Sequence, residues 1–200
     1  RKVELISDLK EALQNKGILF TMIMFFLIQV CVMLLQPLIT MYVGQLMGQV
    51  NDEAVQMAGV IFSLAGISGI LAAPFWGKRG QRYGYVKTFC YITFGAGVVN
   101  LLQFFTTDVY QFAVVQFIYG LFLAGAIPNI NANLAEVTDK SIRGKAFGLV
   151  TSAQMSGGFV GPLLGGALGY FLPTKLVIIS TGIILISVAG YTYLKKIKEL

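Results

Sequence analysis

The sequence predicts an all-α membrane protein with six transmembrane helices. Of its 200 residues, 56% are hydrophobic and 12% are charged, and the mean hydropathy is +0.75. Soluble domains carry roughly 25% charged residues, so this chain has too few to cover a water-facing surface of its own. The charged residues also lie between long apolar runs and not in the middle of them. Lipid is therefore the solvent that the composition predicts for most of the chain.

Each apolar run is long enough to cross a bilayer, which needs about 20 apolar residues. Because an unpaired backbone polar group is costly in lipid, each run should be helical. The expected spans are Ile18–Leu46, Ala54–Trp76, Thr88–Thr106, Val109–Ala135, Ala146–Leu172 and Thr174–Leu194. Together they form a predicted six-helix bundle over residues 17–194.

The two ends of the chain differ from the bundle. Residues 1–16 carry apolar side chains at helical spacing with charged ones opposite, which predicts an amphipathic leader along the cytoplasmic surface. A linker without structure is the alternative for this segment. Residues 195–200 form a basic cytoplasmic tail. The chain begins with Arg1 and not with Met, which indicates a piece of a longer protein.

The basic residues alternate between connections. Of the 15 Lys and Arg residues, all but Lys175 fall in the N-terminal segment, the second and fourth connections, or the tail. Positive residues favour the cytoplasmic side, so we expect a multi-pass protein of the cell membrane with both termini in the cytoplasm. Trp76 is expected at the headgroup level of the inner face. The basic residues form no stripe and no nucleic-acid motif, so nucleic acid is not an expected partner.

Catalytic and metal-binding patterns are missing from the sequence. Cys31 and Cys90 lie deep in apolar runs, and the chain has no His. No Cys/His, Ser/His or paired-carboxylate constellation occurs, so we expect neither an enzyme nor a metal site nor a bound cofactor.

The second connection carries a glycine and basic pattern made of Gly77, Gln81, Arg82, Gly84 and Lys87. It resembles motif A of the major facilitator superfamily, which joins the second and third helices of each six-helix half. Gln81 stands where that motif has an Asp. The resemblance implies a loop that controls the cytoplasmic gate through contacts made in only one conformational state.

The fifth span carries a run of small residues that includes Gly157, Gly161, Pro162, Gly165 and Gly166. Small residues at this spacing let helix backbones approach closely, and proline removes one intrahelical hydrogen bond. The run is similar to the antiporter motif of drug-exporting members of the superfamily, which implies export. Ordinary helix packing is the alternative.

The resemblance extends over nearly all of residues 17–194. In the fourth span, Gln116 precedes Gly120 by four residues, where the superfamily has an Arg. The resemblance implies one half of a twelve-helix transporter. The leader before the first span is similar to the link between halves, so the expected half is the C-terminal one, helices seven to twelve.

Polar and adaptable side chains in the first and fourth spans predict a substrate cavity. In the superfamily these helices line the cavity between the halves, near the midplane of the membrane. An apolar cavity with amide and phenol groups suits hydrophobic drug-like molecules. Hydrogen bonds between helices are the alternative role. The candidates are Gln29, Met33, Gln36, Gln116, Tyr119, Asn129 and Asn133.

The leading hypothesis is therefore the C-terminal half of a secondary transporter that exports small hydrophobic molecules by alternating access. Its expected partners are the lipid bilayer, a small-molecule substrate, and an N-terminal half or a second copy of this half. No carboxylate or His lies within a span, so proton coupling would depend on the other half. The alternatives are a superfamily transporter for sugars or other metabolites, and a six-helix scaffold or homodimer without transport.

Overall fold

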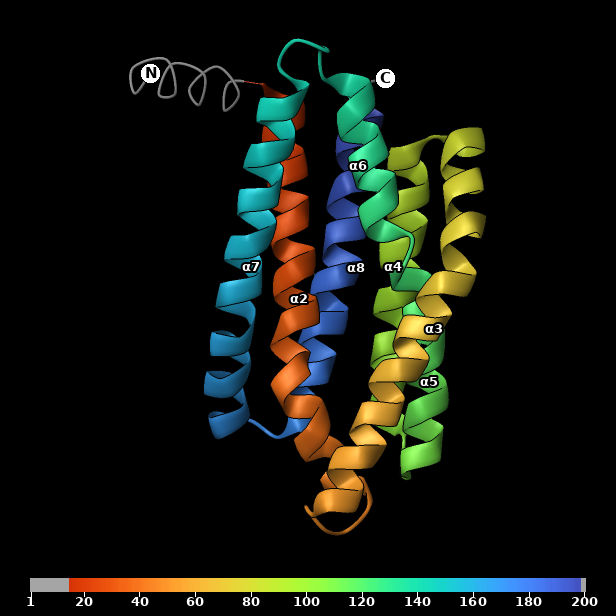
Figure 1. Cartoon of the computed structure of the whole chain (residues 1–200), viewed down its shortest axis with the longest axis vertical. Helices are drawn as coiled ribbons and strands as arrows, with labels where there is room; N and C mark the ends of the chain where they lie inside the picture. The colour runs from red at the N-terminus through yellow and green to blue at the C-terminus, as the bar shows by residue number, and fades with distance from the viewer. Residues whose placement is uncertain (1–14, 199–200) are drawn as a thin grey trace.

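A computed structural model describes residues 15–198 as an all-helical bundle (Figure 1). The amphipathic leader expected over 1–16 falls almost wholly outside the described residues, and so does the end of the tail. Within the described range, the helices are α2 (Lys16–Leu46), α3 (Asp52–Tyr83), α4 (Tyr85–Leu102), α5 (Val109–Leu123), α6 (Ala126–Val137), α7 (Arg143–Phe171) and α8 (Thr174–Lys198), with a short 3₁₀ turn η1 (Gln103–Phe105) after α4.

Five helical stretches among the described residues are long and apolar enough to cross a membrane. They are α2, α3, α4 with η1, α5 with α6, and α8. The sixth predicted span, α7, has 29 residues and runs beside α2 (Figure 1). It contains many Gly residues and is not among the five apolar stretches. The bundle thus has the six predicted members.

Side chains just before three of the helices define where those helices begin. Asn15 accepts hydrogen bonds from the backbone N–H groups of Gly17 and Ile18. Asn51 caps α3, and Asp108 caps α5, in the same way. Because the first N–H groups of a helix have no partner within it, Asn and Asp are favoured at these positions. The caps fall in the polar connections that separate the predicted spans.

The fourth span is not the single helix that the apolar run predicts. Its helix stops at Leu123 and restarts at Ala126, where Gly125 donates to the Phe122 carbonyl and not to that of Leu121. Pro128 has no N–H to continue the ladder. Broken helices are tolerated at membrane depth only where other groups satisfy the freed backbone. Neighbouring side chains must therefore supply the missing hydrogen bonds.

Trp76 supplies one of those bonds, and the Asn129 side chain connects α6 to α3. The indole N–H of Trp76 donates to the Leu121 carbonyl oxygen at 2.6 Å. The Asn129 amide donates to the carbonyl oxygens of Gly125 at 2.8 Å and Trp76 at 3.3 Å. Trp76 is buried against neighbouring helices, and α3 continues beyond it to Tyr83. Its depth in the membrane stays a prediction.

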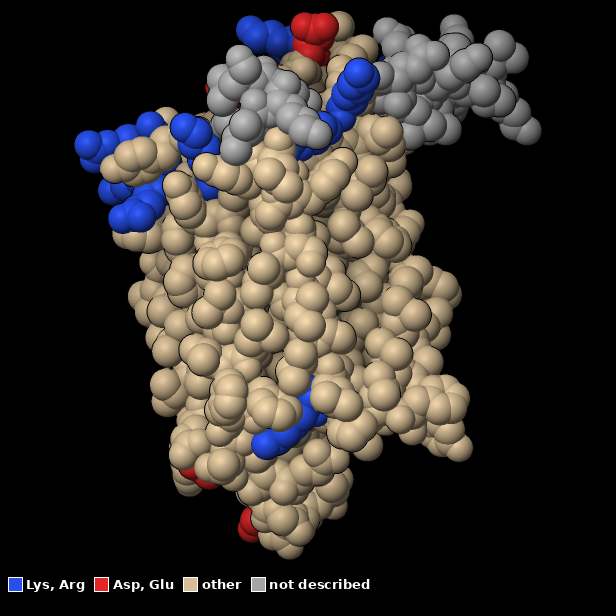
Figure 2. Space-filling view, turned by 180° about the vertical axis from the view of Figure 1, so that it is seen from behind, with Lys and Arg blue, Asp and Glu red and all other residues tan. Residues whose placement is uncertain are grey.

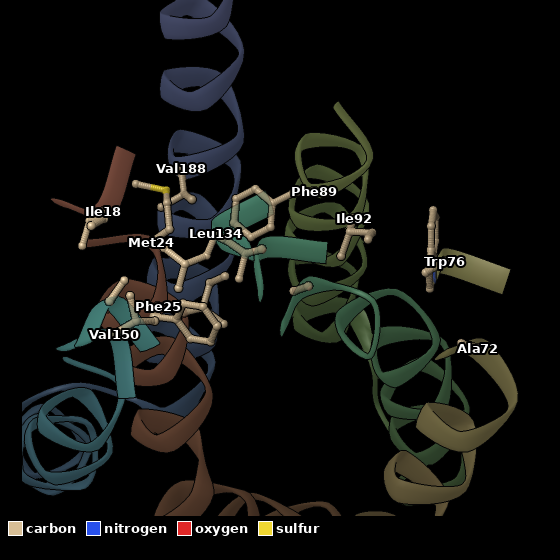
Figure 3. Close-up of a cluster of buried hydrophobic side chains, with 14 residues drawn as sticks. Ile18, Met24, Phe25, Ala72, Trp76, Phe89, Ile92, Leu134, Val150 and Val188 are labelled. Carbon is tan, nitrogen blue, oxygen red and sulfur yellow. The ribbon is translucent and has the colours of Figure 1, made fainter. Parts of the chain in front are cut away.

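Buried apolar side chains from several helices fill the bundle on both sides of this break. In one cluster, Leu134 of α6 lies among Met24 and Phe25 of α2, Phe89 of α4 and Val188 of α8 (Figure 3). A second cluster, which includes Leu38, Tyr42 and Phe112, packs the opposite half of α2 against α3 and α5. The two clusters hold α2 at the centre of the bundle.

Charged residues separate to the two ends of the molecule. Figure 2 shows Lys and Arg gathered at the end where α2 begins and α8 finishes. Lys175 lies at the start of α8, at the other end, where its ammonium group donates to the Thr106 carbonyl oxygen at 3.3 Å. Between the ends, the visible surface is uncharged except for one basic side chain in its lower part (Figure 2). An uncharged band between two polar ends is the surface expected of a bundle that crosses a bilayer.

Candidate substrate cavity

A pocket of about 330 Å³ opens between α2, α3 and the α5–α6 pair. From α2 it is lined by side chains in the middle of the helix, including Gln29, Val32 and Gln36. Gly66 and Gly69 of α3 line it too, and a Cβ atom built at Gly66 would meet nothing within 4 Å. Pockets of 300–1,000 Å³ are typical of small-molecule sites. The glycines leave the space, and the neighbouring helices supply an apolar lining.

Four of the seven predicted substrate-contacting residues line this pocket. Gln29 and Gln36 lie on one face of α2, and Gln116 and Tyr119 come from α5. Gln36 is exposed and Gln29 is half-buried, whereas the two residues on α5 are buried. The pocket therefore offers amides at its open side and a phenol and a further amide in its depth. Their role as substrate contacts stays a prediction.

Two glutamines outside the candidate set hold the amides of the pocket. The side chain of Gln103, in η1, donates to the Gln116 side-chain oxygen at 2.8 Å. Gln154 of α7 donates to the Gln29 side-chain oxygen at 3.5 Å. Both partners are polar residues in otherwise apolar runs. This polar character marks Gln103 and Gln154 in the sequence as residues that need a partner. The sequence does not show which amide of the pocket each one contacts.

Tyr119 presents a polar group without a partner. It is 6% exposed, and its hydroxyl is buried without a hydrogen bond. The residue lines the pocket, and a buried hydroxyl without a partner costs free energy. Tyr119 also packs in a core cluster with Cys31, and its hydroxyl has no accessible surface. The ring of Tyr119 therefore lines the pocket, but a ligand would reach its hydroxyl only after neighbouring side chains moved.

The other three candidates lie outside this pocket. Met33 faces α7, where a Cβ atom built at Gly161 would be 2.7 Å from its Cβ atom. Asn129 is buried at the α5–α6 break and bonds to the backbone there. Asn133 lines a different pocket, at the basic end of the bundle. Each of these three side chains faces a neighbour other than the pocket. Periodicity shows which residues share a helix face, but it does not show which element that face contacts.

The connection between the second and third spans is mostly helical. Gly77, Gln81 and Arg82 lie in the last turns of α3, and Lys87 lies in the first turn of α4. The chain turns only at Gly84, whose φ of 91° and ψ of 137° favour glycine. Gln81, Arg82 and Lys87 are exposed at the basic end. The segment is thus a sharp joint between two helices with its polar groups outside the bundle.

The small residues of α7 form a stripe against α2. Cβ atoms built at Gly157 and Gly161 would lie 2.7 Å from the Phe26 carbonyl oxygen and 3.0 Å from that of Val30. One built at Gly165 would meet the Leu34 carbonyl oxygen. Side chains larger than hydrogen do not fit there, so the two backbones are in direct contact.

Pro162 and Gly166 lie off this stripe. Both are exposed, and a Cβ atom built at Gly166 meets nothing within 4 Å. The antiporter-like run thus divides into a packing face and an open face.

A family model described as Major Facilitator Superfamily matches residues 18–198. The chain belongs to the Major Facilitator Superfamily. The match covers all but the first two residues of the bundle, and it includes α7.

Similar proteins include two multidrug resistance proteins of the same name. Multidrug resistance protein MdtG of Yersinia enterocolitica serotype O:8 / biotype 1B is 33% identical over 136 residues, which are 68% of this chain and 32% of that protein. Multidrug resistance protein MdtG of Escherichia coli O1:K1 / APEC is 32% identical over 136 residues, or 68% of this chain and 33% of the relative. The chain spans about a third of the length of these relatives.

The pocket of this superfamily member offers hydrogen bonds and dispersion contacts but no charge. Its lining residues include no Asp, Glu, Lys or Arg. Among the described residues, no group of three or more His, Cys, Asp and Glu side chains is placed to hold a metal ion. The arrangement can bind an apolar molecule and orient one or two of its polar groups.

Proposed function

We propose that this chain is one six-helix half of an exporter of small hydrophobic molecules, with the pocket as its share of the substrate site. The pocket carries the proposal, because its lining is apolar apart from three amides and one phenol. Such a lining suits hydrophobic molecules of varied shape better than sugars, whose many hydroxyl groups each need a partner. The names of the relatives, which concern multidrug resistance, favour the same substrate class.

The open side of the pocket favours docking of a second six-helix half. Apolar side chains are also exposed elsewhere on α3 and α7, such as Ile70, Leu71 and Phe159. A second half placed there would close the pocket, and rocking of the two halves would expose it to each side of the membrane in turn. The partner half is an N-terminal half or a second copy of this one.

The separation of charges favours one orientation in the cell membrane. The basic end would face the cytoplasm, since positive residues are retained there, and both ends of this chain would lie inside. The exposed Arg82 and Lys87 then flank the joint at Gly84 on the cytoplasmic side. In this arrangement the joint acts on the cytoplasmic gate, through contacts made in one state of the transporter.

Proton coupling, if the exporter uses it, depends on groups outside this pocket. A coupling site needs a titratable group within the membrane, such as a carboxylate or a histidine. The chain has no His, and no Asp or Glu lines the pocket. The coupling group would therefore belong to the other half.

The test is dye efflux from cells that express the full gene product with Gly66→Leu. A Cβ atom at this position meets nothing within 4 Å, so a leucine side chain has room to enter the pocket. We expect efflux of a bulky hydrophobic dye to fall about tenfold, which corresponds to about 1.4 kcal/mol of lost binding. The same assay with and without a proton gradient reports on coupling.

The matched control is Gly59→Leu on the same helix. Gly59 is exposed like Gly66 and has nothing within 4 Å of a built Cβ atom, but it does not line the pocket. We expect this variant to keep normal efflux at equal expression. Equal efflux by both variants would contradict the pocket's role, and transport of sugars in place of dyes would favour the metabolite alternative.

A further inference from the structure

Two pockets adjoin at the basic end of the bundle, away from the substrate pocket. One, of about 470 Å³, is a groove between α2 and α8. The other, of about 280 Å³, lies between the starts of α2 and α4 and the ends of α6 and α8. Lys16, Phe20 and Lys195 line both of them. Neither pocket shares a lining residue with the substrate pocket.

The groove and its neighbour differ in chemistry. The groove is lined mainly by apolar side chains, among them Leu19, Ile23 and Ile184. Leu19 and Ile23 are exposed on the surface of the bundle, so the groove opens sideways, toward the lipid that the composition predicts. The adjoining pocket is more polar, and it contains the amide of Asn133.

The two lysines stand where the apolar and polar parts meet. Lys16 is the first residue of α2, and the Lys195 ammonium group lies 4.4 Å from the centre of the Phe20 ring. The described residues that line the two pockets include no Asp or Glu. Each lysine near an anionic surface adds attraction for acidic lipid headgroups, and basic pockets between membrane helices are suited to such headgroups.

We propose that these two pockets together bind one anionic phospholipid of the leaflet at the basic end. The phosphate lies between Lys16 and Lys195, the rest of the headgroup lies beside Asn133, and an acyl chain follows the groove between α2 and α8. A free phosphate would use the lysines and leave the apolar groove empty. A phospholipid would use both parts, because its charged phosphate is attached next to its acyl chains and the two lysines lie next to the apolar groove.

The proposal gives Asn133 a role apart from the substrate pocket. Its amide is half-buried at the basic end of α6, far along the helix pair from Gln116 and Tyr119. An uncharged donor and acceptor at that depth fits a glycerol or similar headgroup. Asn133 would then contact a membrane lipid and not the transported molecule.

The experiment counts lipids that stay bound to the purified full gene product in native mass spectrometry. Phosphatidylglycerol is titrated in parallel with phosphatidylcholine, and with glycerophosphoglycerol, which has the headgroup but no acyl chains. We expect phosphatidylglycerol to bind about 30-fold more tightly than phosphatidylcholine, the ratio that two lysines at a membrane surface supply. Glycerophosphoglycerol should not bind measurably.

Two changes separate the charged and apolar parts of the site. The pair Lys16→Gln and Lys195→Gln should abolish the preference for phosphatidylglycerol, whereas the pair Lys78→Gln and Lys140→Gln, at exposed lysines of the same end outside both pockets, should keep it. Ser187→Trp fills the groove from α8 without touching a lysine and should weaken both lipids. Its control is Ser152→Trp at an exposed serine of α7. Thermal unfolding shows that each variant is folded.

Three outcomes would overturn the proposal. An unchanged lipid preference in the first lysine pair, or an equal loss in the control pair, would mean that the basic end attracts acidic lipids without a site. Equal binding of glycerophosphoglycerol would mean an anion site that does not use the groove. Normal lipid retention in Ser187→Trp would mean that no acyl chain lies there.

Discussion

At the break between α5 and α6, one side chain replaces a backbone hydrogen bond that the helix lacks. Trp76 donates to the Leu121 carbonyl oxygen, and its ring packs against Phe122 with centroids 5.8 Å apart. A Cβ atom built at Gly125 would lie 2.5 Å from the Cβ atom of Trp76, so the two elements are in close contact. The broken helix is thus held from outside, by α3.

Replacing Trp76 with Phe should destabilise the bundle. The Leu121 carbonyl would lose its indole donor in a buried setting, and hydrogen bonds between membrane helices contribute about 0.6 kcal/mol on average and up to about 1.7. We expect a loss of about 1 kcal/mol, measured by thermal or denaturant unfolding in detergent. Tyr91→Phe, at an exposed aromatic residue of α4, is the control. Equal stability of the two variants would show that the indole bond does not hold the break.

Side-chain chemistry in the sequence identifies part of the candidate cavity. Gln29 and Gln36, seven residues apart, share a helix face, and the structure places both at the pocket. Met33 lies between them in sequence but faces α7, because α2 is central and has neighbours on several sides. Which neighbour lies against each face depends on the packing of the whole bundle. Periodicity within α2 alone does not contain that information.

At the scale of helices, hydropathy predicts which stretches cross the membrane better than it predicts where they end or break. All six runs are helical, but α3 extends seven residues beyond its predicted end at Trp76. The basic residues in that extension predict a polar connection, although its backbone is helical. The fourth run breaks in two although it contains no charged residue, because Gly125 and Pro128 act on the backbone and not on hydropathy.

The contact between α7 and α2 depends on glycine at defined positions. In Gly165→Ala the new methyl group would meet the Leu34 carbonyl oxygen, and forcing extra atoms into a packed contact costs about 1–3 kcal/mol. In Gly166→Ala the methyl group would meet open space, and alanine favours a helix over glycine by about 1 kcal/mol. Gly165→Ala should therefore lower the free energy of unfolding, whereas Gly166→Ala should raise it. If both variants were equally stable, the stripe would not be a packing surface.

At the scale of the whole molecule, the arrangement of helices and the distribution of charge are separate properties. The family match and the packing of α2 against α7, α3 and α8 describe the bundle, whichever way it lies in the membrane. The orientation rests on Lys and Arg, which gather at one end (Figure 2). The charge pattern is visible in the sequence because it depends on which connection a residue occupies and not on packing.

The proposed orientation predicts which connections an impermeant maleimide reaches from outside intact cells. Val50 is 71% exposed in the connection between α2 and α3, and Ser141 is exposed in the connection between α6 and α7, at the basic end. We expect Val50→Cys to be labelled in intact cells and Ser141→Cys only after permeabilisation. The native Cys31 and Cys90 are buried within the bundle, so labelling of the unsubstituted protein should be low and measures the background. Labelling of Ser141→Cys but not Val50→Cys in intact cells would invert the orientation. Labelling of both from outside would contradict the odd number of crossings between them.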